Sequence, residues 1–146
     1  MYIVFIIVSF ISRTVLLSMS FHDVNLGIGG ILWAYGVGLF FDTVAFSYFM
    51  IPYVLISTFI SYKFYSSGAY KWITYVFYFI TFYIFLFNGV SEYFFWEEFG
   101  VRYNFIAVDY LIYTTEVIGN IKESYPMPAL ITVLTIISAA LTYFLY

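Results

Sequence analysis

WITYVFYFITFYIFLFNGV, residues 72–90, is the stretch that decides the fold of this chain. It contains no charged residue, and its aromatic side chains outnumber its aliphatic ones. As an α-helix at 1.5 Å per residue it is roughly 28 Å long, close to the ~30 Å thickness of the hydrocarbon core of a bilayer. A stretch of this length and polarity predicts a transmembrane helix.

The composition of the whole chain indicates an integral membrane protein. Of its 146 residues, 64% are hydrophobic, 27% are aromatic and only 9% are charged. An ordinary soluble domain carries about 25% charged residues, and a domain of this size could not hide so much apolar surface from water. We therefore expect an all-α integral membrane protein that forms a single membrane domain.

The composition also excludes several kinds of functional site. The chain has no cysteine, which removes disulfides, thiolate metal sites and cysteine nucleophiles. One histidine, His22, cannot form a cluster of histidine ligands within one chain. Five basic residues in a chain of net charge −3 do not make a nucleic-acid surface. We expect no cofactor or metal in this chain and no nucleic-acid partner.

Three further apolar stretches have the length of a membrane span. We expect about four transmembrane helices, near residues 2–21, 42–62, 72–90 and 127–146. The first stretch lacks the basic start of a secretory signal, so we expect it to be retained. The last stretch runs to the final residue without a polar closing sequence, so we expect the chain to be cut from a longer protein.

The run from residue 26 to residue 60 carries one charge, Asp42. As a single helix it would be about 52 Å long, too long for one span without a bend. Its first part is rich in glycine, which lowers helix stability, and Pro52 predicts a kink in its second part. We expect a short interfacial helix near residues 28–40 and then the span near 42–62. Two separate spans within 26–60 are the alternative.

Basic residues in short loops predict the orientation of the spans. Lys63 and Lys71 lie at the two ends of the short loop 63–71, which places this loop in the cytoplasm. The N-terminus is then cytoplasmic, and residues 91–125 lie on the opposite side of the membrane.

Arg13 and Asp42 are charged residues within or beside predicted spans. A charge in a span is costly and usually has a partner or a wet cavity. Arg13 lies past the middle of the first span, and Asp42 begins the next span from the same side of the membrane. Three interpretations remain open: an ion pair between the two helices, a substrate-facing role for Arg13, and two side chains that reach the interface separately.

The external segment 91–125 holds all five glutamates of the chain. Within it, Arg102, Asp109 and Glu116 are spaced by seven residues, so on a helix they drift only about 20° per heptad and line one stripe. This pattern predicts an external amphipathic helix, with Asn104 as its N-cap.

The polar stripe of this helix allows three roles. It can be a solvated surface, a seat for a partner domain, or a guide for a lipid headgroup. Gly119 and Asn120 predict a loosening near the end of the helix. Glu97 and Glu98 are adjacent and point to different helix faces, so an interfacial acidic rim is favoured over a metal site.

Residues 100–126 also resemble a known protein family. The matching pieces are Arg102-Tyr103-Asn104-Phe105, Asp109-Tyr110, Glu116-Val117, Gly119-Asn120-Ile121 and Ser124-Tyr125-Pro126. A shorter piece, Gly38-Leu39-Phe40-Phe41-Asp42, matches farther upstream. With the order of spans, these pieces resemble the N-terminal membrane domain of lipoteichoic acid synthase-like proteins of the Gram-negative type, within the alkaline phosphatase/sulfatase superfamily.

This resemblance implies about five membrane helices followed by a large extracytoplasmic catalytic domain. Such a domain transfers phosphoglycerol or related groups from a lipid, with a threonine nucleophile and a divalent metal. The chain lacks that domain, so we expect it to be inactive alone and to anchor and orient the domain in a bacterial inner membrane.

The partners expected on this basis are the lipid bilayer, a C-terminal catalytic domain in cis and a phospholipid substrate. The candidate structural or domain-docking residues are Arg13, Asp42, Arg102, Asn104, Asp109 and Glu116. The alternative is a stand-alone membrane scaffold or interaction protein without enzymatic activity.

Overall fold

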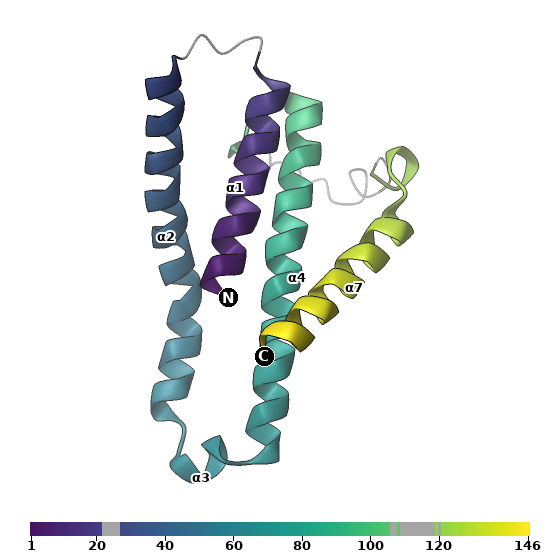
Figure 1. Ribbon diagram of the computed structural model, residues 1–146. Helices are drawn as coiled ribbons and strands as arrows, with labels where there is room; N and C mark the ends of the chain where they lie inside the picture. The colour runs from purple at the N-terminus through teal and green to yellow at the C-terminus, as the bar shows by residue number, and fades with distance from the viewer. Residues whose placement is uncertain (22–26, 106–107, 109–118, 120) are drawn as a thin grey trace.

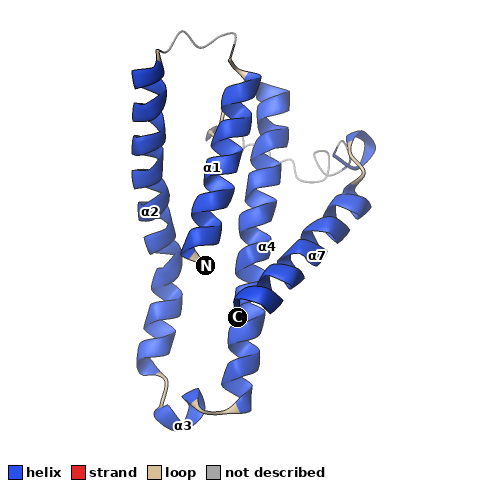
Figure 2. Ribbon diagram, in the orientation of Figure 1, coloured by secondary structure: helices blue, strands red, loops and turns tan. Residues whose placement is uncertain are grey.

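The computed structural model describes residues 1–21, 27–105, 108, 119 and 121–146. These residues form helices and turns, with no strand among them (Figure 2). The helices long and apolar enough to span a membrane are α1 (Tyr2–Met19), α2 (Ile28–Phe59), α4 (Gly68–Phe99) and α7 (Met127–Leu145). The predicted all-α membrane fold is confirmed, with four helices in the described part of the chain that are long and apolar enough to span a bilayer.

The long helices α2 and α4 run in opposite directions and form the frame of the molecule (Figure 1). Helix α1 contacts both of them, and α7 packs against α4. The short helix α3 (Tyr62–Tyr65) lies in the connection between α2 and α4. Helix α1 is therefore the element that joins α2 to α4 at the end of the frame opposite to α3.

Helices α4 and α7 bury small polar side chains where they meet. On α7, Leu134, Ser138 and Thr142 recur every four residues and are at most 4% exposed. On α4, Thr81 and Phe82 are fully buried or nearly so. Lipid tails are as apolar as leucine, so helices in a bilayer associate through close packing, which small residues permit.

Helix α2 is one continuous helix of 32 residues, about 48 Å at 1.5 Å per residue. The predicted separation into a short helix near 28–40 and a span near 42–62 is wrong, as is the alternative of two spans. The helix also continues through Pro52. In apolar surroundings an unpaired backbone group costs several kcal/mol, whereas a helical glycine costs only about 1 kcal/mol. Continuing the helix is therefore cheaper than breaking it.

The boundaries around α4 also differ from the sequence prediction. Residues 63–71 are not a plain loop, because α3 contains Lys63 and α4 already begins at Gly68, after Ser67 accepts a capping hydrogen bond from the backbone N–H of Tyr70. At the other end, α4 continues through residues 91–99, so the segment that we expect to be external begins within this helix. The helix ends at Gly100, whose φ of 65° is the left-handed conformation that glycine adopts readily.

The predicted external amphipathic helix lies largely outside the described residues. Asp109 and Glu116 belong to that part of the chain. Asn104 directly precedes the helical residue Phe105, which agrees with its predicted place as N-cap. Gly119 and residues 121–124 are helical, whereas Asn120, the other residue of the predicted loosening, lies outside the described residues. Pro126, which follows, is the N-cap of α7.

Candidate functional site: a polar layer across the helix bundle

Two adjacent residues of α1, Ser12 and Arg13, bind carboxylates on opposite neighbours. The Ser12 hydroxyl donates to Oε2 of Glu92 on α4 at 2.8 Å. Arg13 Nη2 donates to Oδ2 of Asp42 on α2 at 2.7 Å. We call Ser12, Arg13, Asp42, Glu92 and Arg102 the polar layer, because together they connect α1, α2, α4 and the turn after α4.

The Arg13–Asp42 ion pair is largely shielded from solvent. The two side chains are 14% and 17% exposed. Arg13 also lies 5.8 Å from the ring centroid of Tyr35, and the Tyr35 hydroxyl is 2.8 Å from the Thr14 hydroxyl. Of the interpretations left open by the sequence, the structure shows the ion pair between the two helices. Asp42, however, lies within α2 and does not begin it.

The guanidinium of Arg13 packs directly against the backbone of Gly38. A Cβ added at Gly38 would collide with the Cζ of Arg13. Gly38 and Asp42 are four residues apart, so they lie one turn apart on the same face of α2. The spacing of Gly38 and Asp42 thus has a physical explanation. Glycine leaves room for the guanidinium at the helix surface, and the aspartate one turn later neutralises its charge.

Glu92 is the most buried charged residue in the described part of the chain, at 5% exposure. Besides the hydroxyl of Ser12, it accepts a hydrogen bond from Nε of Arg102, at 2.5 Å from Oε1. A buried carboxylate without such partners would be strongly destabilising. Sequence reasoning missed Glu92 because it was read as part of an external segment.

A signal for Glu92 exists in the sequence of α4. Its buried residues Thr74, Thr81, Phe85 and Glu92 are spaced by seven, four and seven, so they lie on one face of the helix. A glutamate on this inward face demands a cationic partner from another element.

The chain turns back along α4 after Gly100. Arg102 bonds to Glu92, and the hydroxyl of Tyr103 donates to the hydroxyl of Ser91 at 2.5 Å. The two pairs advance in opposite directions along the sequence, which is the register of a chain that folds back. Arg102 is therefore not the first residue of a helical stripe, as predicted, because residues 101–103 are not helical and its side chain serves Glu92.

The Tyr103 phenol is held in its neutral form by its surroundings. Burial raises the pKa of Tyr103 above its usual value of 10.0, and the nearby Glu92 carboxylate acts in the same direction. The contact with Ser91 lowers this pKa but does not outweigh the other two causes.

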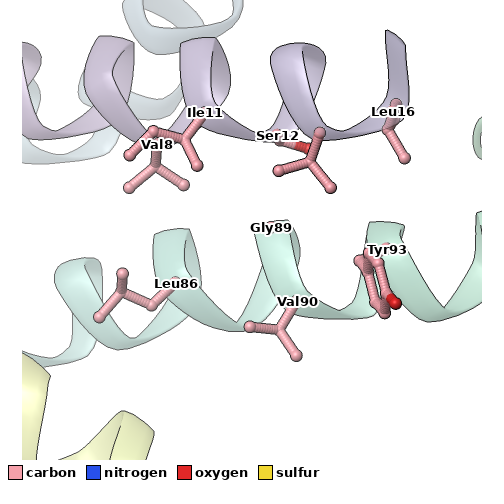
Figure 3. A pocket seen from close by; sticks show the side chains of 9 residues that line it. Val8, Ile11, Ser12, Leu16, Leu86, Gly89, Val90 and Tyr93 are labelled. Carbon is pink, nitrogen blue, oxygen red and sulfur yellow. The ribbon is translucent and has the colours of Figure 1, made fainter. Parts of the chain in front are cut away.

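Cavities lie on both sides of α1. Between α1 and α4 there is an apolar cavity of about 300 Å³ (Figure 3). The labelled residues in that view are Val8, Ile11, Ser12, Leu16, Leu86, Gly89, Val90 and Tyr93. Between α1 and α2 there is a second cavity of about 310 Å³, which Arg13 and Asp42 line together with Tyr35. The wall of this second cavity contains the Arg13–Asp42 ion pair.

The polar layer borders two uncharged runs of the chain. Residues 43–62 of the chain and residues 72–91 are two uncharged runs of twenty residues each. Each is about 30 Å long as a helix, the thickness of a hydrocarbon core. Asp42 directly precedes the first run and Glu92 directly follows the second.

The layer offers hydrogen-bond donors and carboxylates but no cluster of metal ligands. Among the residues that the structure describes, no group of three or more histidine, cysteine, aspartate or glutamate side chains could hold a metal ion. No protein-family model, no curated protein and no solved structure matches this chain.

Proposed function

We propose that this chain is the membrane-anchoring domain of a sulfatase-superfamily transferase of the phosphoglycerol or phosphoethanolamine type. Its role is to hold an extracytoplasmic catalytic domain in a fixed orientation at the surface of a bacterial inner membrane. The residues 63–71 then face the cytoplasm, and the polar layer faces the opposite side. The observation that supports this proposal most is the fold-back, in which Arg102 and Tyr103 bind the end of α4.

The fold-back supports an orienting role because of where it lies in the chain. Arg102 and Tyr103 begin the segment that resembles the family, and the Gly38-to-Asp42 piece forms the other half of the polar layer. The two stretches that carry the resemblance thus have tertiary roles at the same end of the bundle. A segment fixed to α4 at its start offers a surface in a defined position, on which a catalytic domain can dock in one orientation.

In this arrangement the catalytic domain and the membrane domain have separate roles. The divalent metal and the threonine nucleophile implied by the resemblance would belong to the catalytic domain. The residues of this chain would supply orientation, which matters because a misplacement of about 1 Å can cost roughly 100-fold in rate.

The gene sequence that follows the codon for Tyr146 is the first test. We expect it to encode a further membrane helix and then a domain of the sulfatase type. A stop codon at that position contradicts the proposal and favours a membrane scaffold without enzymatic activity.

The second test measures transfer from labelled phosphatidylglycerol and phosphatidylethanolamine by the full-length protein in vesicles. We expect Arg102→Gln to lower the rate roughly 10- to 100-fold, because the fold-back loses its charged anchor, while the isolated catalytic domain keeps its activity on a soluble ester. Glu98→Gln is the matched control, since Glu98 is an exposed carboxylate near the same end of α4. Equal rates for Arg102→Gln and the wild type would contradict an orienting role.

A further inference from the structure

We propose that the connection between α2 and α4 docks on a negatively charged leaflet surface, with Lys63 and Lys71 as its cationic contacts. We call residues 59–72, which include α3, the basic aromatic end of the bundle. Its partner is the headgroup layer as a charged surface, which concentrates anionic lipids around this end. The inference goes beyond the proposed function and does not depend on it, because it requires only this chain and a bilayer.

The first observation is the distribution of charge along the chain. Lys63 and Lys71 are the only charged residues between Asp42 and Glu92. Both lysines are exposed, and neither belongs to an ion pair within the described part of the chain. A lysine close to an anionic membrane surface gains about 1 kcal/mol. Two such lysines, without an acidic side chain in their part of the sequence, favour an anionic partner.

The second observation is the exposure of aromatic rings beside these lysines. Phe59 and Tyr62 are each 85% exposed, and Trp72, next to Lys71, is 71% exposed. Tyrosine and tryptophan are enriched at membrane–water interfaces, where the ring meets apolar matter and its polar group meets water. A soluble polyanion would leave these rings in water, which is unfavourable. The rings therefore favour a lipid surface over a soluble anionic partner.

The third observation is the position of this end relative to the long helices. Helix α2 ends at Phe59 and α4 begins at Gly68, so both lysines lie where the two long helices are joined (Figure 1). An exposed ammonium group in hydrocarbon is costly. Two exposed lysines at the ends of uncharged runs therefore place this end of the bundle in a headgroup layer.

The fourth observation is that side-chain packing fixes the connection against α4. The Tyr70 ring lies 4.7 Å from that of Tyr65 and 6.2 Å from that of Phe64, measured between centroids. The Ser67 hydroxyl accepts a hydrogen bond from the backbone N–H of Tyr70 at 3.2 Å. Because the backbone of the two lysines is already ordered, binding costs less conformational entropy than it would from a flexible loop.

The experiment uses Trp72 as a reporter of the lipids around it. Trp33 and Trp96 are replaced by phenylalanine, and the full chain is reconstituted in vesicles of phosphatidylcholine and phosphatidylglycerol in equal amounts. Either one lipid or the other carries brominated acyl chains, which quench tryptophan on contact. We expect phosphatidylglycerol to be enriched roughly two- to fivefold over phosphatidylcholine next to Trp72. Equal quenching by the two lipids would overturn the proposal.

Salt and substitution test the lysines separately. High salt should reduce the enrichment toward one, because ions screen exposed charges. Lys63→Gln combined with Lys71→Gln should abolish it, while the total quenching of Trp72 stays the same and shows that the chain is still inserted. If the double variant does not insert, the two single variants take its place, and each should weaken the enrichment. An enrichment that neither salt nor the inserted variants change would overturn the proposal.

Trp33 provides the matched control within the same chain. It is 75% exposed and lies on α2 toward the end opposite to α3. With Trp72 and Trp96 replaced by phenylalanine, the two brominated lipids should quench Trp33 equally. The same enrichment at Trp33 as at Trp72 would overturn the proposal, because the preference would then belong to the whole bundle.

Discussion

At Gly38 the absence of a side chain lets the Arg13 guanidinium lie against α2 and reach Asp42. The other glycines of the first half of α2 for which the surroundings are known, Gly29 and Gly36, have nothing within 4 Å of an added Cβ. The glycines of this region therefore have unequal roles. Single-residue substitutions can distinguish a required glycine from an incidental one.

We predict that Gly38→Ala destabilises the chain by about 1–3 kcal/mol, the usual cost of overpacking. The new methyl group displaces the guanidinium from its seat and separates it from Asp42. The free energy of unfolding in mixed detergent micelles measures the effect. Gly29→Ala is the control, and it should be neutral or stabilising by up to about 1 kcal/mol, because alanine favours helix. Equal effects of the two substitutions would contradict the proposed role of Gly38.

We predict that Tyr103 loses its proton above its usual pKa of 10.0. Burial raises the pKa in the folded chain, so folding favours the neutral phenol, and this contribution to stability is present below pH 10.0. It is lost as the pH rises through the raised pKa. The difference in tyrosinate absorbance between the wild type and Tyr103→Phe, followed over pH, measures the midpoint. A midpoint at or below 10.0 would show that Tyr103 is not shielded.

Among the elements, α7 depends on α4 for its place in the bundle. The face that α7 buries contains Ser138 and Thr142, both fully buried. The Thr142 hydroxyl donates to the backbone carbonyl of Ser138 at 2.7 Å. The hydroxyls of Ser138 and Thr81 have no hydrogen-bond partner in the described structure. Close packing, more than side-chain hydrogen bonding, therefore holds α7 against α4.

We predict opposite effects for two substitutions at Ser138. Ser138→Ala should be neutral or stabilising by up to about 1 kcal/mol, because it removes a buried hydroxyl without a partner. Ser138→Leu should destabilise by about 1–3 kcal/mol, because leucine does not fit between the helices. Unfolding in mixed micelles measures both variants. Ala140→Leu, on the exposed side of α7, controls for added volume and should change little. A loss of stability in Ser138→Ala would mean that its hydroxyl is needed.

For the whole molecule, α4 is one of the two long helices that connect the two ends of the bundle. Its uncharged run of residues 72–91 separates Lys71 from Glu92 and matches one bilayer thickness. The charged residues near its two ends should therefore lie on opposite sides of a membrane.

We predict that Ser66→Cys and Glu98→Cys are labelled by a membrane-impermeant maleimide from opposite sides of sealed vesicles. The chain has no natural cysteine, so each variant carries a single reactive thiol, and both positions are exposed. Labelling before and after the vesicles are permeabilised shows the side on which each thiol lies. Labelling of both thiols from the same side would contradict a membrane crossing by α4.

The helical membrane fold could be predicted from the sequence because each apolar helix is recognisable from its own residues. Apolar length and polarity predict each span within its own segment, which is why the helices at 2–19 and 127–145 agree closely with the prediction. It also placed Arg13 and Asp42 at compatible depths, and this made their pair one of the expected interpretations. It went wrong at α2, where local glycine content predicted a break that the apolar surroundings make too costly.

The amino-acid sequence by itself determined that this is a helical membrane protein, because hydrophobic length and the near absence of charge are properties of each segment alone. Only the tertiary structure decided that Arg13 lies on Gly38, that Glu92 is buried, and that Arg102 turns back to meet it. These facts depend on the rotation and depth of one helix relative to another. Residues far apart in the sequence set those variables together, so no single segment contains them.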